Sequence, residues 1–261
     1  MNDPVRLDVK DHVAVLTLDR PETFNALDLA TATALAGVLL GVSSDPEVRA
    51  VVLTGAGRAF SAGGDLRHAM SHPHGPPAAF RELATGVHVC VAEVRRMAKP
   101  VIAAVNGVAA GGGFSLALAC DFRVMAASAR LVQGYTSQGL AIDAGGTFTL
   151  PRLVGLARAL EIAAFDEPIP ADRALAWGLA TRVVPDESVL EEALAMAAAL
   201  AGRSVHAFGQ VKRLLTDGFD TPLEAQLERE RAALVACAGH PDGVEGIRAF
   251  LEKRRPVFGR E

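Results

Sequence analysis

Hydrophobic and polar residues alternate near the start of the chain. Residues 5–9 and 12–18 have the two-residue alternation and the β-branched side chains of paired strands, and Asp-Arg-Pro-Glu at 19–22 interrupts the pattern. Asp28 then stands where a helix cap is expected, before a segment of helical periodicity that extends to about residue 40. The pattern predicts a hairpin followed by a helix.

The middle of the chain alternates short apolar runs with helical segments. Apolar runs that predict buried strands occupy residues 48–53, 101–105 and 122–125. Helical periodicity covers residues 78–97 and 112–120, and the Pro-rich segment 71–77 predicts a loop before the first of these helices. This alternation predicts an α/β fold, in which successive strand–helix units can stack as turns of a spiral.

Beyond Gly145 the periodicity becomes mainly helical. The expected helices cover residues 147–153, 156–165, 171–177, 188–201, 205–215, 222–237 and 242–254. We therefore expect a core with the functional site over residues 1–195 and a helical region over residues 196–261.

Composition narrows the class of protein. The chain has 261 residues, of which half are hydrophobic, so it can bury a substantial core. Its net charge of −4 argues against a nucleic-acid partner, which would require clustered Lys and Arg. Three dispersed cysteines without C-x-x-C spacing, and no recognisable signal peptide or membrane span, lead us to expect a cytoplasmic protein.

Two glycine-rich turns are the strongest chemical feature of the sequence. Ala-Phe-Ser-Ala-Gly-Gly-Asp at 59–65 and Asn-Gly-Val-Ala-Ala-Gly-Gly-Gly at 106–113 each follow an apolar run and lead into a helical segment. Glycine lets a ligand oxygen approach the backbone, and a helix start presents unpaired N–H donors. Two such turns can form an oxyanion hole. A dinucleotide-binding turn is a poorer interpretation, because the G-x-G-x-x-G spacing is missing.

Several motifs together resemble the enoyl-CoA hydratase/isomerase family, also called the crotonase superfamily. These motifs are Arg-Pro-Glu-Thr-Phe-Asn-Ala-Leu at 20–27, the segment 53–66 around the first glycine turn, Lys-Pro-Val-Ile-Ala-Ala-Val-Asn-Gly at 99–107, and residues 246–254. The resemblance covers essentially the whole chain. It implies a spiral of ββα units with a C-terminal helical region that forms homotrimers or dimers of trimers.

The same resemblance implies an acyl-CoA thioester as substrate, with CoA as part of the substrate and no separate cofactor or metal. It assigns the two oxyanion donors to Gly64 and Gly112. It further implies that a small group of residues lines the CoA channel or lies near the CoA phosphates, in part from a neighbouring subunit: Ala62, Asp65, Leu66, Arg67 and Lys253.

The choice of reaction depends on the acid or base beside the hole. Hydratases of the family resemble one another in two glutamates, and the matching positions here hold Ser115 and Tyr135, neither of which is a carboxylate base. Asp143 lies in Leu-Ala-Ile-Asp-Ala-Gly-Gly-Thr, a pattern similar to that of ring-1,2-epoxyphenylacetyl-CoA isomerases, in which the matching aspartate shuttles a proton. An isomerase that acts through Asp143 is the favoured hypothesis.

Three alternatives remain open. One is an enoyl-CoA hydratase with an atypical base. Another is a hydrolytic 4-chlorobenzoyl-CoA dehalogenase or thioesterase, in which Asp143 would be the nucleophile and His88 a base, although the tryptophan of that subgroup is replaced by Tyr135. The third is a catalytically silent member that binds acyl-CoA or RNA. Taken alone, Asp143 could also be a helix cap and His88 a structural residue.

Overall fold

The computed structural model describes residues 3–259. Its chain begins with the predicted hairpin, in which β1 (Val5–Lys10) and β2 (Val13–Leu18) pair antiparallel from Val5 opposite Leu18 to Lys10 opposite Val13. The turn residues Asp11 and His12 have φ values of 49° and 64°. This tight left-handed turn joins the two strands directly.

A six-stranded sheet forms the larger layer of the core. Its order is β1-β2-β3-β5-β7-β10, and every pair from β2 onward is parallel. The added strands are β3 (Ala50–Gly55), β5 (Val101–Val105), β7 (Phe122–Ala126) and β10 (Arg182–Val184). All residues of β3 and β5 are buried, which explains why both are continuous apolar runs.

A second, smaller sheet carries the site described below. Its order is β4-β6-β8-β9, with β4 (Ala59–Ser61), β6 (Val108–Ala110) and β8 (Arg130–Val132) parallel and β9 (Ile169–Pro170) antiparallel to β8. Each parallel strand follows closely on a strand of the large sheet and precedes helical structure. The chain therefore winds in repeated ββα units, and the predicted spiral is confirmed.

The core helices agree with the periodicity of the sequence. They are α1 (Leu29–Ser44), α2 (Leu66–Ser71), α3 (Pro76–Arg96), α4 (Gly112–Ala119), α5 (Gly146–Phe165) and α6 (Ala171–Ala176), with short 3-10 turns at Pro21–Thr23, Thr136–Gln138, Asp186–Ser188 and Gly218–Asp220. Asp28 caps α1 by accepting a hydrogen bond of 2.8 Å from Thr31 N. Gly155, with a φ of 76°, divides α5 into the two helices that the sequence predicts.

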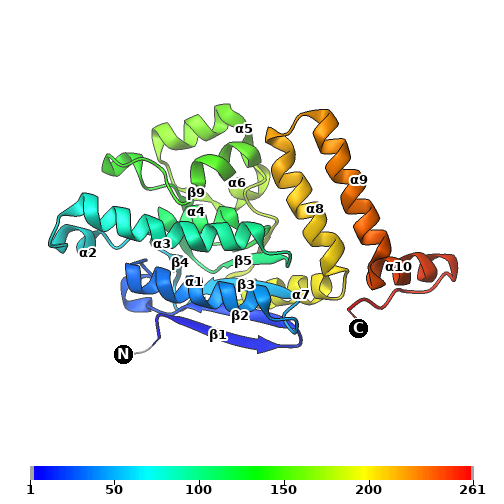
Figure 1. Ribbon diagram of the computed structural model, residues 1–261. Coiled ribbons are helices and arrows are strands. Elements are labelled where there is room, and N and C mark those ends of the chain that lie inside the picture. The colour runs from blue at the N-terminus through cyan, green and yellow to red at the C-terminus, as the bar shows by residue number, and fades with distance from the viewer. Residues whose placement is uncertain (1–2, 260–261) are drawn as a thin grey trace.

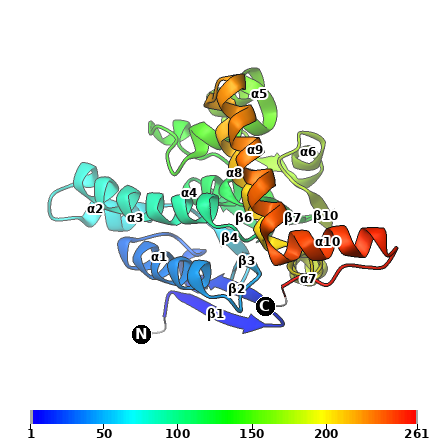
Figure 2. The same cartoon turned by 45° about the vertical axis from the view of Figure 1, so that its right-hand side comes forward.

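The helices at the C-terminal end extend away from the sheets. α7 (Val189–Ala201) packs its buried face on the large sheet, and the expected boundary after residue 195 falls inside this helix. α8 (Val205–Asp217), α9 (Leu223–Gly239) and α10 (Pro241–Leu251) form the region that projects from the core (Figures 1 and 2). Among the helices of residues 3–259, none is long and apolar enough to span a membrane.

A buried ion pair attaches α8 to the core. Lys212 Nζ donates to Asp121 Oδ2 and to Val94 O, both at 2.8 Å. Burial raises the pKa of Asp121 and lowers that of Lys212, and each charge opposes the shift of the other. The pair thus joins the C-terminal region to the end of α3 and the start of β7.

Candidate active site

The two glycine turns meet at the carboxyl ends of β4 and β6. Gly64 and Gly112 both line a cavity of about 400 Å³. Within residues 3–259, the backbone N–H of neither glycine donates to a protein acceptor, whereas the neighbouring Gly111 N donates to Val132 O at 3.1 Å. Two free donors on residues that line one cavity can stabilise a negative charge that develops on a substrate oxygen.

Close backbone contact explains why these turns need glycine. Gly63 has a φ of 86°, and a Cβ atom there would lie 2.8 Å from Gly112 N. A Cβ atom on Gly113 would lie 2.5 Å from Ser61 O. The small residues therefore allow the start of α4 to lie directly against the first turn.

Buried polar side chains fix the first turn. Asn25 Nδ2 donates to Ala56 O at 2.9 Å and to Ala59 O at 2.8 Å. Ser61 Oγ donates to Asn25 O at 2.8 Å and accepts from Gly63 N at 3.2 Å. Sequence reasoning did not assign these roles to Asn25 and Ser61, although both lie in the motifs that carry the family resemblance.

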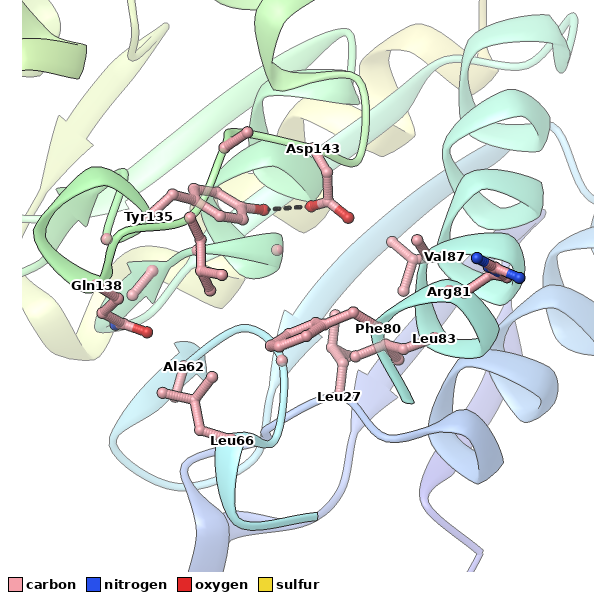
Figure 3. A pocket seen from close by; sticks show the side chains of 18 of the residues that line it. Leu27, Ala62, Leu66, Phe80, Arg81, Leu83, Val87, Tyr135, Gln138 and Asp143 are labelled. Carbon is pink, nitrogen blue, oxygen red and sulfur yellow. Dashed lines mark hydrogen bonds between the residues drawn. The ribbon is translucent and has the colours of Figure 1, made fainter. Parts of the chain in front are cut away.

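The loop after β8 supplies the acid and the phenol of the site. Tyr135 Oη donates to Asp143 Oδ1 at 2.6 Å (Figure 3). Burial raises the pKa of Tyr135, and the adjacent negative charge of Asp143 raises it further. The phenol therefore stays protonated and acts as the donor in this hydrogen bond.

Ser115 lies behind this pair. Its hydroxyl is buried and has no hydrogen bond of good geometry to any described residue. A Cβ atom on Gly146 would lie 2.6 Å from Ser115 Oγ, so the first turn of α5 packs closely on α4 at this point. Ser115 thus lies next to Tyr135 and Gly146, and it does not hydrogen-bond to Asp143.

The remainder of the cavity is largely apolar. Figure 3 shows Tyr135 and Asp143 on one side, facing Phe80 and Leu83 across the cavity. The larger apolar lining residues are Leu27, Leu66, Pro77, Phe80, Leu83, Val87 and Leu140. Asp143 is the one carboxylate among the described lining residues, and Arg81, which is exposed, is the one cation. Such a cavity suits an uncharged hydrocarbon group beside a polar reacting centre.

The expected CoA-channel residues fall into two groups. Ala62 and Leu66 line the cavity. Asp65 instead caps α2 through His68 N at 3.0 Å, and Arg67 is exposed. Lys253 follows α10, and α10 lies at the opposite end of the molecule from α2 in both views (Figures 1 and 2). Lys253 does not line the cavity of this chain.

The geometry does not bring His88 to Asp143. His88 is on the exposed face of α3, and it is the preceding residue, Val87, that lines the cavity. The position of His88 in the structure therefore does not support a role as a catalytic base.

Comparison with known proteins agrees with this architecture. The family model described as enoyl-CoA hydratase/isomerase matches residues 8–261. A probable enoyl-CoA hydratase of Rhodobacter capsulatus is 42% identical over 258 residues, with 97% of each chain covered. The 1,2-epoxyphenylacetyl-CoA isomerase of Escherichia coli is 38% identical over 251 residues, with 96% of each chain covered.

Solved structures give the same result for the fold. The crystal structure of an enoyl-CoA hydratase from Polaromonas sp. JS666 superposes with a TM-score of 0.92 at 39% identity, covering 97% of this chain and 98% of that one. The glycine turns, the ββα spiral and these matches lead to one conclusion: the chain belongs to the enoyl-CoA hydratase/isomerase family, whose crotonase fold it has.

Proposed function

We propose that this acyl-CoA enzyme is an isomerase, which moves a carbon–carbon double bond or rearranges a ring next to the thioester. The observation that carries the proposal is the position of Asp143. It is the one carboxylate among the described residues of the cavity, which is also lined by Gly64 and Gly112 with their free N–H groups. The two positions that match the glutamates of hydratases hold Ser115 and Tyr135.

The proposed reaction needs one base and one oxyanion hole. With a 3-enoyl-CoA, Asp143 removes a proton from C2, and the electrons pass into a dienolate whose thioester oxygen accepts hydrogen bonds from Gly64 and Gly112. Asp143 then returns the proton to C4, and the double bond lies between C2 and C3. Each preorganised N–H is worth about 3–4 kcal/mol of transition-state stabilisation.

Mass spectrometry in D2O tests the proposal. A 3-enoyl-CoA should yield a 2-enoyl-CoA, with deuterium incorporated to the extent that Asp143 exchanges with solvent. Addition of water would instead indicate the hydratase named among the relatives. Release of free CoA would indicate a thioesterase, and loss of halide from a 4-chlorobenzoyl-CoA would indicate a dehalogenase. No conversion combined with salt-sensitive RNA retention would indicate a silent binder.

Asp143→Asn gives the residue-level test. We expect this variant to lose about 10²- to 10⁴-fold in kcat, because it removes the proton-transferring group, while binding of a saturated acyl-CoA stays unchanged. Asp8→Asn, at an exposed position of β1, is the matched control and should keep the parent activity. Equal turnover by Asp143→Asn and parent would overturn the assignment.

A further inference from the structure

Several hydrogen bonds hold the loop around Tyr135 in place. Tyr135 N donates to Gln133 Oε1 at 3.1 Å, and Tyr135 O accepts from Gln138 N and Leu140 N, each at 2.9 Å. Asp166, at the end of α5, accepts from the neighbouring Gly134 N at 2.7 Å. These bonds fix the backbone on both sides of the tyrosine, and the residue as a whole is only 8% exposed.

The phenol has one strong interaction, and it is with Asp143. The Tyr135–Asp143 distance of 2.6 Å is that of a hydrogen bond from a hydroxyl to a carboxylate. Figure 3 shows the second carboxylate oxygen turned away from Tyr135. None of the residues 3–259 donates a hydrogen bond to this Oδ2 atom, so one oxygen is held and the other is free.

We propose that Tyr135 is a positioning residue that holds Asp143 Oδ1, so that Oδ2 is the oxygen that takes and returns the substrate proton. This inference rests on the proposed isomerase function and deepens it. A free aspartate side chain samples several rotamers, and a displacement of about 1 Å can cost about 10²-fold in rate. The bond to a rigid, buried phenol removes most of that freedom before substrate binds.

Few other charges can perturb the pair. Among the described residues that line the cavity, the titratable or charged groups are Tyr135, Asp143 and Arg81 on α3. Arg81 is exposed, so solvent screens it, and α4 contributes only the uncharged Ser115 next to the phenol. Changes in the pH profile on altering Tyr135 will therefore report on its bond to Asp143.

Tyr135→Phe tests the proposal. We expect kcat to fall about 10- to 100-fold while KM changes little, because the variant misplaces the base but leaves the oxyanion hole and the apolar lining intact. The acid limb of the kcat profile should move to higher pH, since a carboxylate that loses a hydrogen-bond donor is protonated more readily. Thr33→Val is the control, because it removes an α1 hydroxyl that donates to Leu29 O at 2.8 Å and does not line the cavity, and it should leave the profile unchanged.

Comparison with Asp143→Asn separates the two proposals. If Asp143→Asn is inactive and Tyr135→Phe has the parent kcat and pH profile, the positioning role is wrong and the isomerase proposal stands. If Asp143→Asn is active, the isomerase mechanism itself is wrong. If both roles are right, Tyr135→Phe combined with Asp143→Asn should be no slower than Asp143→Asn alone, because the two residues act as one unit.

A second measurement does not depend on whether Tyr135→Phe folds correctly. Tyr135 is the only tyrosine of the chain, so biosynthetic incorporation of 3-fluorotyrosine labels this one phenol. A fluorinated phenol is a stronger donor, and the acid limb should then move to lower pH, opposite to the effect of Tyr135→Phe. A 19F resonance that does not respond to Asp143→Asn, together with an unmoved acid limb, would overturn the inference.

Discussion

The absence of a side chain at Gly113 lets α4 lie close to the first glycine turn. A Cβ atom there would lie 2.5 Å from the carbonyl oxygen of Ser61 and 2.7 Å from its Cβ. Both contacts are shorter than van der Waals distance, so α4 or the first glycine turn would have to move. Because Gly112 and Gly64 belong to these two segments, such a movement would separate the two free N–H donors.

Gly113→Ala should therefore reduce both stability and activity. We expect the free energy of unfolding to fall by about 1–3 kcal/mol from overpacking, and kcat to fall more than KM rises. Gly37→Ala is the control, because Gly37 is exposed within α1 and its added Cβ would meet no atom within 4 Å. That substitution should raise stability by about 0.5–1 kcal/mol. Urea unfolding followed by circular dichroism measures both, and parent-like stability of Gly113→Ala would contradict the packing account.

Sequence patterns identify which residues form turns more reliably than they predict the directions in which side chains point. Gly64, Gly112 and Asp143 were recognisable from their motifs, and all three line the cavity. The bond from Tyr135 to Asp143 was not predictable, because its direction depends on a loop that includes Gly139 at a φ of 70°. His88 could have been placed, since the buried positions Val87, Cys90 and Val94 define the inner face of α3.

At the scale of elements, short strands were the part of the fold that sequence reasoning missed. β4, β6 and β8 have three residues each, too few to establish a two-residue alternation. Longer elements were predicted well, because α1, α3 and the strands β3, β5 and β7 have enough residues for their period or apolar run to be visible. The expected boundary at residue 195 cut α7, whose buried face depends on contacts with the distant large sheet.

The attachment of α8 gives a prediction at this scale. Lys212→Met leaves Asp121 buried without its partner, and we expect the free energy of unfolding to fall by about 3–5 kcal/mol. Arg6→Met is the control, because Arg6 pairs with Asp19 at 2.6 Å but its side chain is 61% exposed. That change should cost less than about 1 kcal/mol. Equal effects in thermal or urea unfolding would show that Lys212 does not anchor the helix.

At the scale of the whole molecule, the projecting helices expose large apolar side chains. Phe250 and Leu251 at the end of α10 are 82% and 74% exposed. Others on α9 and α10 are Leu223, Leu227, Leu234, Val235, Val244 and Ile247. Exposed apolar surface of this kind marks a contact surface, and we propose that a second copy of this chain covers it in a trimer or a dimer of trimers.

Phe250→Glu tests this assembly. The parent should have a solution mass of three or six times the 27.2 kDa chain, and the variant should shift toward 27.2 kDa because the charge cannot be buried between copies. Val9→Glu, at an exposed position of β1, should leave the mass unchanged. Light scattering after size-exclusion chromatography measures all three, and a monomeric parent would contradict the proposal.

The order of strands in the small sheet divides the site into separable parts. Adjacent parallel strands β4, β6 and β8 lead respectively to Gly64, to Gly112 and to the loop that holds Tyr135 and Asp143. The proposed oxyanion donors and the proposed proton-transferring residue therefore come from different turns of the spiral. A substitution in the 133–146 loop can therefore change the proposed proton-transferring group while the strands that lead to Gly64 and Gly112 keep their sequence.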